Sequence, residues 1–222
     1  MAETCPLCHH THTLTFYHSE RRSYFRCQNC ALIFVSRADL LSPKGEKARY
    51  DLHENDPADP GYRSFLRQLI RPLTQKLEKP PLNGLDFGSG PGPALAMMLE
   101  SQGYTMTLYD PYYAPRPKAL GKTYDFVTCT EAIEHFYNPG QDWELLLTLV
   151  KPGGWLGIMT KLIDDLESFP TMHYIKDATH VSFFSRQTFR YLAKRDGLTA
   201  EFSGDNVVLL QKPEHVRGDK DG

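Results

Sequence analysis

Leu85-Asp86-Phe87-Gly88-Ser89-Gly90-Pro91-Gly92 is the stretch that decides the fold. Its first three residues suit a short buried strand, which runs directly into a glycine-rich turn. Residues 94–102, which follow, favour a helix. Glycines between a strand and a helix let the backbone approach a ligand closely. The segment therefore predicts a ligand-binding loop at the carboxyl end of a strand.

Two well-known glycine loops are excluded by residues in this turn. A dinucleotide-binding turn needs Gly-x-Gly-x-x-Gly, and Pro93 stands where the third glycine should be. A phosphate-binding loop needs Gly-Lys followed by Ser or Thr, which the turn lacks. Both of these interpretations of the loop therefore fail.

Strands and helices alternate on the carboxyl side of this loop. The pattern predicts a Rossmann-like α/β fold with a doubly wound, mostly parallel sheet. The predicted strands are 104–109, 124–130, 155–160 and 206–211, the later helices are 143–150 and 186–194, and 151–154 is a turn.

Composition divides the chain into four parts. Residues 1–40 form a zinc-ribbon-like module, and residues 83–211 form the ligand-binding domain. Between them, residues 41–82 hold a charged linker or lid and an amphipathic helix over 61–78, kinked at Pro72. Residues 212–222 are a polar tail.

The overall composition is that of a globular protein with one main core. The chain has 222 residues, 41% hydrophobic and 23% charged, with a formal net charge of −2. This charge gives no field that would draw the protein to nucleic acid. The first residues lack a secretory signal pattern and no segment suits a membrane span, so a cytoplasmic location without a membrane partner is expected.

Two Cys-x-x-Cys pairs indicate a structural zinc site. Cys5 and Cys8 form the first pair and Cys27 and Cys30 the second, with eighteen residues (9–26) between the pairs. Four thiolates complete the tetrahedral coordination of Zn²⁺ and leave no open position for catalysis. The alternatives are buried free thiols, or a ligand drawn from the histidines at positions 9, 10 and 12.

The glycine turn resembles the class I S-adenosylmethionine-dependent methyltransferases, whose first strand commonly ends in Asp-x-Gly-x-Gly-x-Gly. Asp86, Gly88, Gly90 and Gly92 match this motif. Asp110 closes the next strand, where the family's acid binds the ribose hydroxyls of the cofactor. The resemblance spans residues 83 to about 211 and implies a methyltransferase that uses S-adenosylmethionine. It assigns cofactor contacts to these five residues and to Ser89, Pro111, Thr130 and Glu131.

The chain departs from the family pattern after Asp110. Only fourteen residues, 111–124, separate Asp110 from Asp125, and three of them are prolines. A helix, a strand and a second helix do not fit in this space. The family's third strand is therefore predicted to be rudimentary, reduced to residues 118–120, with no clear adenine-contacting residue.

A second constellation follows the strand at 124–130. Glu131, Glu134 and His135 would lie on one face of a helical turn, and His180 comes from a later polar segment. Some methyltransferases of ubiquinone precursors or small-RNA ends hold a divalent ion with a similar Glu-x-x-Glu-His. That resemblance implies a second metal site for Mg²⁺ or Mn²⁺. In the alternative without an ion, Glu131 and His135 line the cofactor site, Glu134 makes a structural hydrogen bond, and His180 is the general base.

Three functions remain open from the sequence. The first is methyl transfer to an O, N or C nucleophile of a small molecule, with His180, His135 and Glu131 as catalytic candidates. The second is an RNA or protein methyltransferase that docks through the zinc module, with its arginines at positions 21, 22, 26 and 37. The third is a cofactor-binding interaction protein without turnover.

Overall fold

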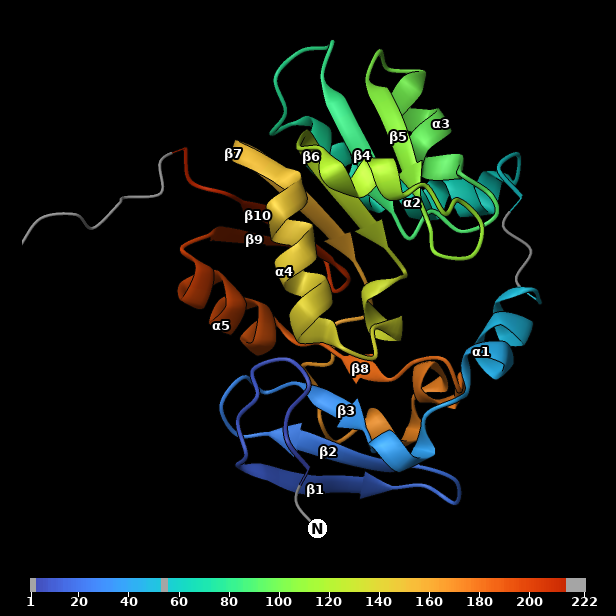
Figure 1. Ribbon diagram of the computed structural model, residues 1–222, viewed down its shortest axis with the longest axis vertical. Coiled ribbons are helices and arrows are strands. Elements are labelled where there is room, and N and C mark those ends of the chain that lie inside the picture. Colours follow the sequence, from blue (N-terminus) through green and yellow to red (C-terminus); the bar gives the residue numbers. More distant parts are fainter. Residues whose placement is uncertain (1–2, 53–55, 215–222) are drawn as a thin grey trace, which may run out of the picture.

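The computed structural model describes residues 3–52 and 56–214 and contains two β-sheets (Figure 1). The larger sheet has six strands in the order β5-β4-β6-β7-β10-β9. Strands β5, β4, β6 and β7 are parallel, whereas β10 and β9 are antiparallel additions. Their bounds are β4 Asn83–Phe87, β5 Thr105–Tyr109, β6 Tyr124–Thr130, β7 Val150–Met159, β9 Thr199–Ser203 and β10 Val207–Gln211.

Helices cover both faces of this sheet. Helices α2 (Pro60–Thr74) and α3 (Ala94–Glu100) pack on one face, and α4 (Pro139–Leu149) and α5 (Arg186–Asp196) on the other. Because successive strand side chains point to opposite faces, β6 sends Phe126 to the first core and Val127 to the second. The predicted Rossmann-like, doubly wound fold is thereby confirmed.

Several elements differ in extent from their sequence-based bounds. Helix α4 starts at Pro139 rather than 143, since proline suits the first turn of a helix. Strand β7 takes in the predicted turn at 151–154, where Gly154 lies so close to the backbone of Asp125 that a Cβ would be 2.6 Å from its carbonyl oxygen. Strand β9 lies in a segment for which the sequence pattern predicts neither a helix nor a strand.

The family's third strand is absent from the described part of the chain. Residues Pro117–Gly121 form a 3-10 helix, so the prediction of a strand remnant at 118–120 is wrong in conformation. The prediction that no full third strand forms is confirmed, and β5 lies at the edge of the sheet.

The predicted linker contains helix α1 (Pro43–Tyr50), which is capped by the Ser42 side chain and has exposed and half-buried residues. None of its residues is buried. Residues 53–55 of the predicted linker lie outside the described residues. The same holds for residues 215–222 of the predicted tail.

A four-stranded antiparallel sheet joins the amino terminus to a distant segment. Its order is β1 (Thr13–His18), β2 (Ser23–Cys27), β3 (Ile33–Val35) and β8 (Ser182–Phe183). Figure 1 shows this sheet below the larger one, with β8 between them. The cysteine segment therefore does not stand apart from the rest of the protein.

The four paired cysteines lie together. The Sγ atoms of Cys5 and Cys30 are 3.6 Å apart, those of Cys8 and Cys27 are 3.5 Å apart, and all four lie within 4.8 Å of one another. The fifth cysteine, Cys129, is buried in the larger sheet. Such a cluster has the ligand set of a closed zinc site.

This cluster is part of the main core. Cys5 and Cys27 belong to the same buried cluster as Trp143 of α4 and Phe189 of α5. The Gly140 N–H also donates to the Pro6 carbonyl at 3.2 Å.

Among the described helices, none has the length and apolar character needed to cross a bilayer.

We expect Cys27→Ser to lose bound zinc and to lower the melting temperature of the whole chain, because the cluster and the larger sheet share one core. Zinc content by atomic absorption and a thermal scan measure both effects. Cys129→Ala is the control and should keep one zinc per chain. A Cys27→Ser protein with full zinc content would contradict the four-thiolate site.

Candidate functional site

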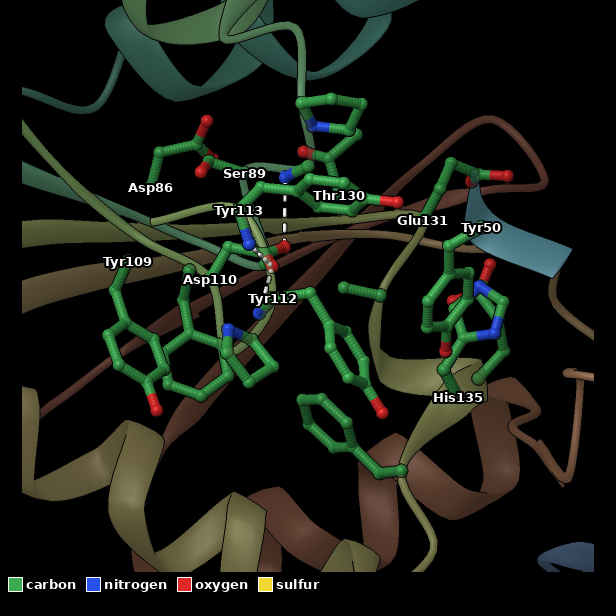
Figure 2. Close-up of a pocket in the computed structure, with 18 of the residues that line it drawn as sticks. Tyr50, Asp86, Ser89, Tyr109, Asp110, Tyr112, Tyr113, Thr130, Glu131 and His135 are labelled. Carbon is green, nitrogen blue, oxygen red and sulfur yellow. Dashed lines mark hydrogen bonds between the residues drawn. The ribbon is translucent and has the colours of Figure 1, made fainter. Parts of the chain in front are cut away.

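A cavity of about 680 Å³ lies at the carboxyl ends of β4, β5 and β6. Parallel α/β sheets bind ligands at this edge. Every cofactor, catalytic and second-metal candidate from the sequence lines it, and Figure 2 shows several of them around one space. They are Asp86, Gly88, Ser89, Gly90, Gly92, Asp110, Pro111, Thr130, Glu131, Glu134, His135 and His180.

The Asp110 carboxylate joins the two loops that form one wall of the cavity. Its Oδ2 accepts the Gly90 N–H at 3.0 Å, and its Oδ1 accepts the N–H groups of Tyr112 and Tyr113 at 2.8 and 2.9 Å (Figure 2). Asp110 is buried. Three charge-assisted hydrogen bonds hold this carboxylate in place while Oδ2 keeps acceptor capacity for a ligand.

At the first position of the turn after β4, Gly88, no residue larger than glycine fits. Gly88 has a φ of +74°, and a Cβ there would lie 2.5 Å from the Ala132 Cβ. Its N–H donates to the Tyr109 carbonyl at 2.8 Å. The backbone of the turn therefore packs directly on the neighbouring loops.

Asp86 is buried beneath this turn. Burial raises its pKa to about 6, although the Thr128 hydroxyl donates to its Oδ1 at 2.8 Å, and the charge of Asp110 adds to the rise. A carboxyl with such a pKa changes charge near neutral pH. The buried Asp86 carboxyl therefore lowers the stability of the folded protein when it is ionised. Groups with such shifted pKa values are common at functional sites.

Glu131 and Glu134 have separate environments. Glu131 follows β6 with a φ of +47°, and burial, together with the charge of Glu134, raises its pKa to about 8. Glu134 is buried in the 3-10 helix Ile133–His135, where its Oε2 accepts the Thr160 hydroxyl at 2.9 Å. Burial also raises the pKa of Glu134, and the charge of His180 opposes this rise.

Two histidines face Glu134 from different segments. The Nδ1 of His135 lies 3.0 Å from the Thr179 carbonyl, and the Nδ1 of His180 lies 2.8 Å from the Tyr174 carbonyl. A carbonyl accepts only, so each ring carries its proton on Nδ1 and the lone pair of the neutral ring on Nε2. The two rings are 4.8 Å apart. Burial lowers the pKa of His180, which favours the neutral ring.

Glu134, His135 and His180 place ligand atoms within 4.8 Å of one another. Glu131 is not in this group, because the backbone bends at Glu131 instead of continuing the helical turn expected from its spacing. Within the described chain, Glu134 Oε1 is buried and has no hydrogen-bond partner. This orphaned oxygen beside two Nε2 atoms fits a divalent ion.

Two further buried hydroxyl oxygens of the cavity lining, Ser89 Oγ and Thr130 Oγ1, also lack a hydrogen-bond partner among the described residues. Native proteins rarely leave such groups unpaired without a ligand or water. Together with Glu134 Oε1 they are buried polar atoms at the cavity that a bound ligand or water would satisfy.

Sequence reasoning missed part of the site. From α1, Glu46 accepts the hydroxyls of Tyr50 and Tyr112, both at 2.8 Å, and so forms a side wall. Thr160 lies just after β7, and the rule that sites gather at strand ends would have found it. Asp142 of α4 also lines the cavity, and burial raises its pKa to about 6.

We expect Asp86→Asn to stabilise the ligand-free protein by about 1 to 3 kcal/mol at pH 8, because the ionised carboxyl no longer has to be buried. Because the pKa of Asp86 is higher in the folded than in the unfolded state, its carboxyl contributes stability at a pH below the unfolded-state pKa. This contribution is lost as the pH rises through the folded-state pKa of about 6. The difference should therefore be smaller at pH 5. Urea unfolding at both pH values measures it.

Asp125→Asn is the control with the opposite sign. Lys151 lies 2.6 Å from the Asp125 carboxylate and, with the Asn83 N–H, holds its pKa below the usual range despite partial burial. This variant should be less stable than the wild type. An Asp86→Asn protein that unfolds at lower urea concentration at pH 8 would contradict the assignment.

Curated proteins and solved structures resemble this chain to different extents. A ubiquinone biosynthesis O-methyltransferase of Burkholderia orbicola is 53% identical over 38 residues, which are 17% of this chain and 16% of that protein. The chain thus matches only about a sixth of the length of such relatives. The structure of an O-methyltransferase family protein from Burkholderia thailandensis aligns with a TM-score of 0.51 and 14% identity, over 78% of this chain and 64% of that one.

A second solved structure has the same fold. It is the complex between the Haloferax volcanii Trm112 methyltransferase activator and a methyltransferase, with a TM-score of 0.50, 12% identity and coverage of 76% of this chain and 97% of that one. Residues 62–201 match the family model described as a methyltransferase domain. This match covers more than half of the sequence and includes the whole glycine turn and Asp110. The chain belongs to the class I S-adenosylmethionine-dependent methyltransferases.

Proposed function

We propose that the protein transfers the methyl group of S-adenosylmethionine to an O, N or C nucleophile of a small molecule, with a hydroxyl oxygen as the favoured acceptor. One observation carries this proposal. The anchored Asp110 and the Glu134-His135-His180 cluster line the same cavity, so cofactor and acceptor chemistry meet there.

The first part of the proposal concerns the cofactor. Asp110 Oδ2 would accept a ribose hydroxyl, since its geometry is already fixed by backbone N–H groups. Gly88, Gly90 and Gly92 would let the backbone approach the cofactor. Ser89, Thr130 and Glu131 would contact its polar groups, together with Asp86 and Pro111. S-adenosylmethionine supplies a methyl group that its sulfonium already activates.

The second part concerns the acceptor. Displacement at a methyl group needs alignment, exclusion of water and, for a hydroxyl, removal of a proton. His180 Nε2 carries the lone pair for this proton, because Nδ1 is committed to the Tyr174 carbonyl. His135, held in the same tautomer, and Glu134 face it. With a pKa raised to about 8, Glu131 is mostly protonated at neutral pH, and its ionised fraction would be a second base beside His180.

A divalent ion, Mg²⁺ or Mn²⁺, is the alternative use of the same cluster, because a His180 Nε2 lone pair that binds an ion no longer accepts the proton. Glu134, His135 and His180 would hold it, and the unpartnered Glu134 Oε1 is the observation that supports it. When bound, such an ion lowers the pKa of an acceptor hydroxyl and orients it. Zn²⁺, bound by the four cysteines, would remain structural.

A small acceptor suits the site better than RNA or protein. Arg22, one of the arginines considered for docking, turns its guanidinium to backbone carbonyls of the 175–180 segment. Arg26 donates to the Gln187 side chain. The basic surface of the zinc module is therefore reduced. The similarity over 38 residues to ubiquinone biosynthesis O-methyltransferases also supports a hydroxyl group of a small molecule as the acceptor.

We expect calorimetry to detect S-adenosylmethionine binding, and Asp110→Asn to weaken it ten- to a hundredfold, since a charged hydrogen-bond acceptor is worth about 1.5 to 3 kcal/mol. Asp165→Asn, on an exposed loop, is the matched control and should bind like the wild type. Absence of binding at millimolar concentration would rule out the enzymatic proposal.

We expect the zinc-loaded protein to transfer labelled methyl groups from S-adenosylmethionine to the low-molecular-weight fraction of a cell extract, and His180→Ala to lose at least tenfold in rate. His18→Ala, exposed on β1, is the control. Label found only in RNA or protein would rule out the small acceptor. Unchanged turnover by His180→Ala would rule out its role in catalysis.

Chelation tests the divalent ion in the same assay. Treatment that removes Mg²⁺ and Mn²⁺, with zinc retention verified, should abolish transfer, and addition of either ion should restore it. Full activity after chelation would rule out the ion and leave His180 as the general base.

A further inference from the structure

Arg22 stands in the tight turn between β1 and β2 of the cysteine module. The Ser19 hydroxyl accepts the Arg22 N–H at 3.0 Å, and the Ser19 N–H donates to the Arg22 carbonyl at 2.9 Å. The guanidinium carbon lies 5.5 Å from the centre of the Tyr24 ring, which is itself buried. The turn hydrogen bonds fix the backbone of Arg22, and the contact with Tyr24 helps to orient its side chain.

The guanidinium contacts four backbone carbonyls of one distant segment. Nη1 donates to the carbonyls of Ala178 and His180 at 3.3 and 3.0 Å, and Nη2 donates to those of Ile175 and Asp177. These residues are more than 150 positions away in the sequence. Carbonyl oxygens that converge need a cation or several donors between them, and a planar guanidinium supplies five N–H groups.

The segment held in this way presents the acceptor half of the site. It runs from the end of the 3-10 helix His173–Lys176 towards strand β8, and Asp177 and His180 of this segment line the cavity. The Thr179 carbonyl receives Nδ1 of His135, so the same segment orients both imidazole rings. Its position therefore decides where both Nε2 atoms lie.

We infer that Arg22 is a positioning residue for methyl transfer, through which the cysteine module holds the 175–180 segment and aims His180 and His135 into the cavity. This inference rests on the proposed function of the two histidines. It also gives the module a second role beside stability, since the module supplies a side chain that supports the reaction centre.

The test compares three zinc-loaded variants with the wild type. Arg22→Met keeps the stem and removes the donors, and Arg22→Lys restores one cation with a single donor point. Arg21→Met is the matched control, because Arg21 is the exposed neighbour in the same turn. Zinc content is measured for each variant, so that a disturbed cysteine cluster is recognised.

Two measurements are made. Hydrogen exchange of peptides covering residues 174–181 should be faster in Arg22→Met, intermediate in Arg22→Lys and unchanged in Arg21→Met. In the extract-labelling assay, the maximal rate of Arg22→Met should fall about tenfold or more. The KM for S-adenosylmethionine should stay at the wild-type value, because the proposed cofactor contacts lie in the turns after β4, β5 and β6 and not in the 175–180 segment. A merely structural loss would affect rate and cofactor KM together.

Unchanged exchange in Arg22→Met would overturn the inference, as would faster exchange with a wild-type maximal rate. If the wild type itself transfers no label, the proposed function fails and the positioning role fails with it. In that case the exchange data still show whether Arg22 holds the segment, so the two failures can be distinguished.

Discussion

The carboxylate of Asp110 is the constraint on which the cavity depends. It accepts one N–H from the turn after β4 and two from the turn after β5, so two loops from neighbouring strands share one anion. The same arrangement leaves an oxygen at the cavity wall with its geometry fixed in advance. A preorganised acceptor binds a hydroxyl with little loss of conformational freedom. The charge of Asp110 also adds to the rise in the pKa of Asp86, which is caused mainly by burial.

The fold and the part of the cavity formed by the turns after β4 and β5 follow from local sequence. The turn at 88–92 could be predicted because glycine conformations and strand ends are encoded within a few residues. The missing third strand could also be predicted, since it depends only on the number of residues between Asp110 and Asp125. The conformation of residues 117–121 could not, because short segments rich in proline have no clear periodicity.

The part of the cavity around Glu134, His135 and His180 depends on contacts that sequence patterns do not contain. The spacing of Glu131, Glu134 and His135 indicated a single helical face, but the positive φ of Glu131 breaks it. Thr160, the partner of Glu134, follows β7 and is brought there by the sheet, whereas the Tyr174 carbonyl that fixes His180 belongs to a 3-10 helix that no periodicity predicts. Arg22 was interpreted as a surface charge, since nothing local shows that its end group meets carbonyls far along the chain.

The pairing of β3 with β8 has a consequence for the order in which the protein is built. Residues 33–34 meet residues 182–183, so the small sheet stays incomplete until most of the chain has left the ribosome. The paired cysteines lie within the first 30 residues and are synthesised long before the segment that Arg22 holds. During synthesis the growing module therefore exposes the edge of β3, and the arrival of β8 covers that edge as the histidine segment takes its place.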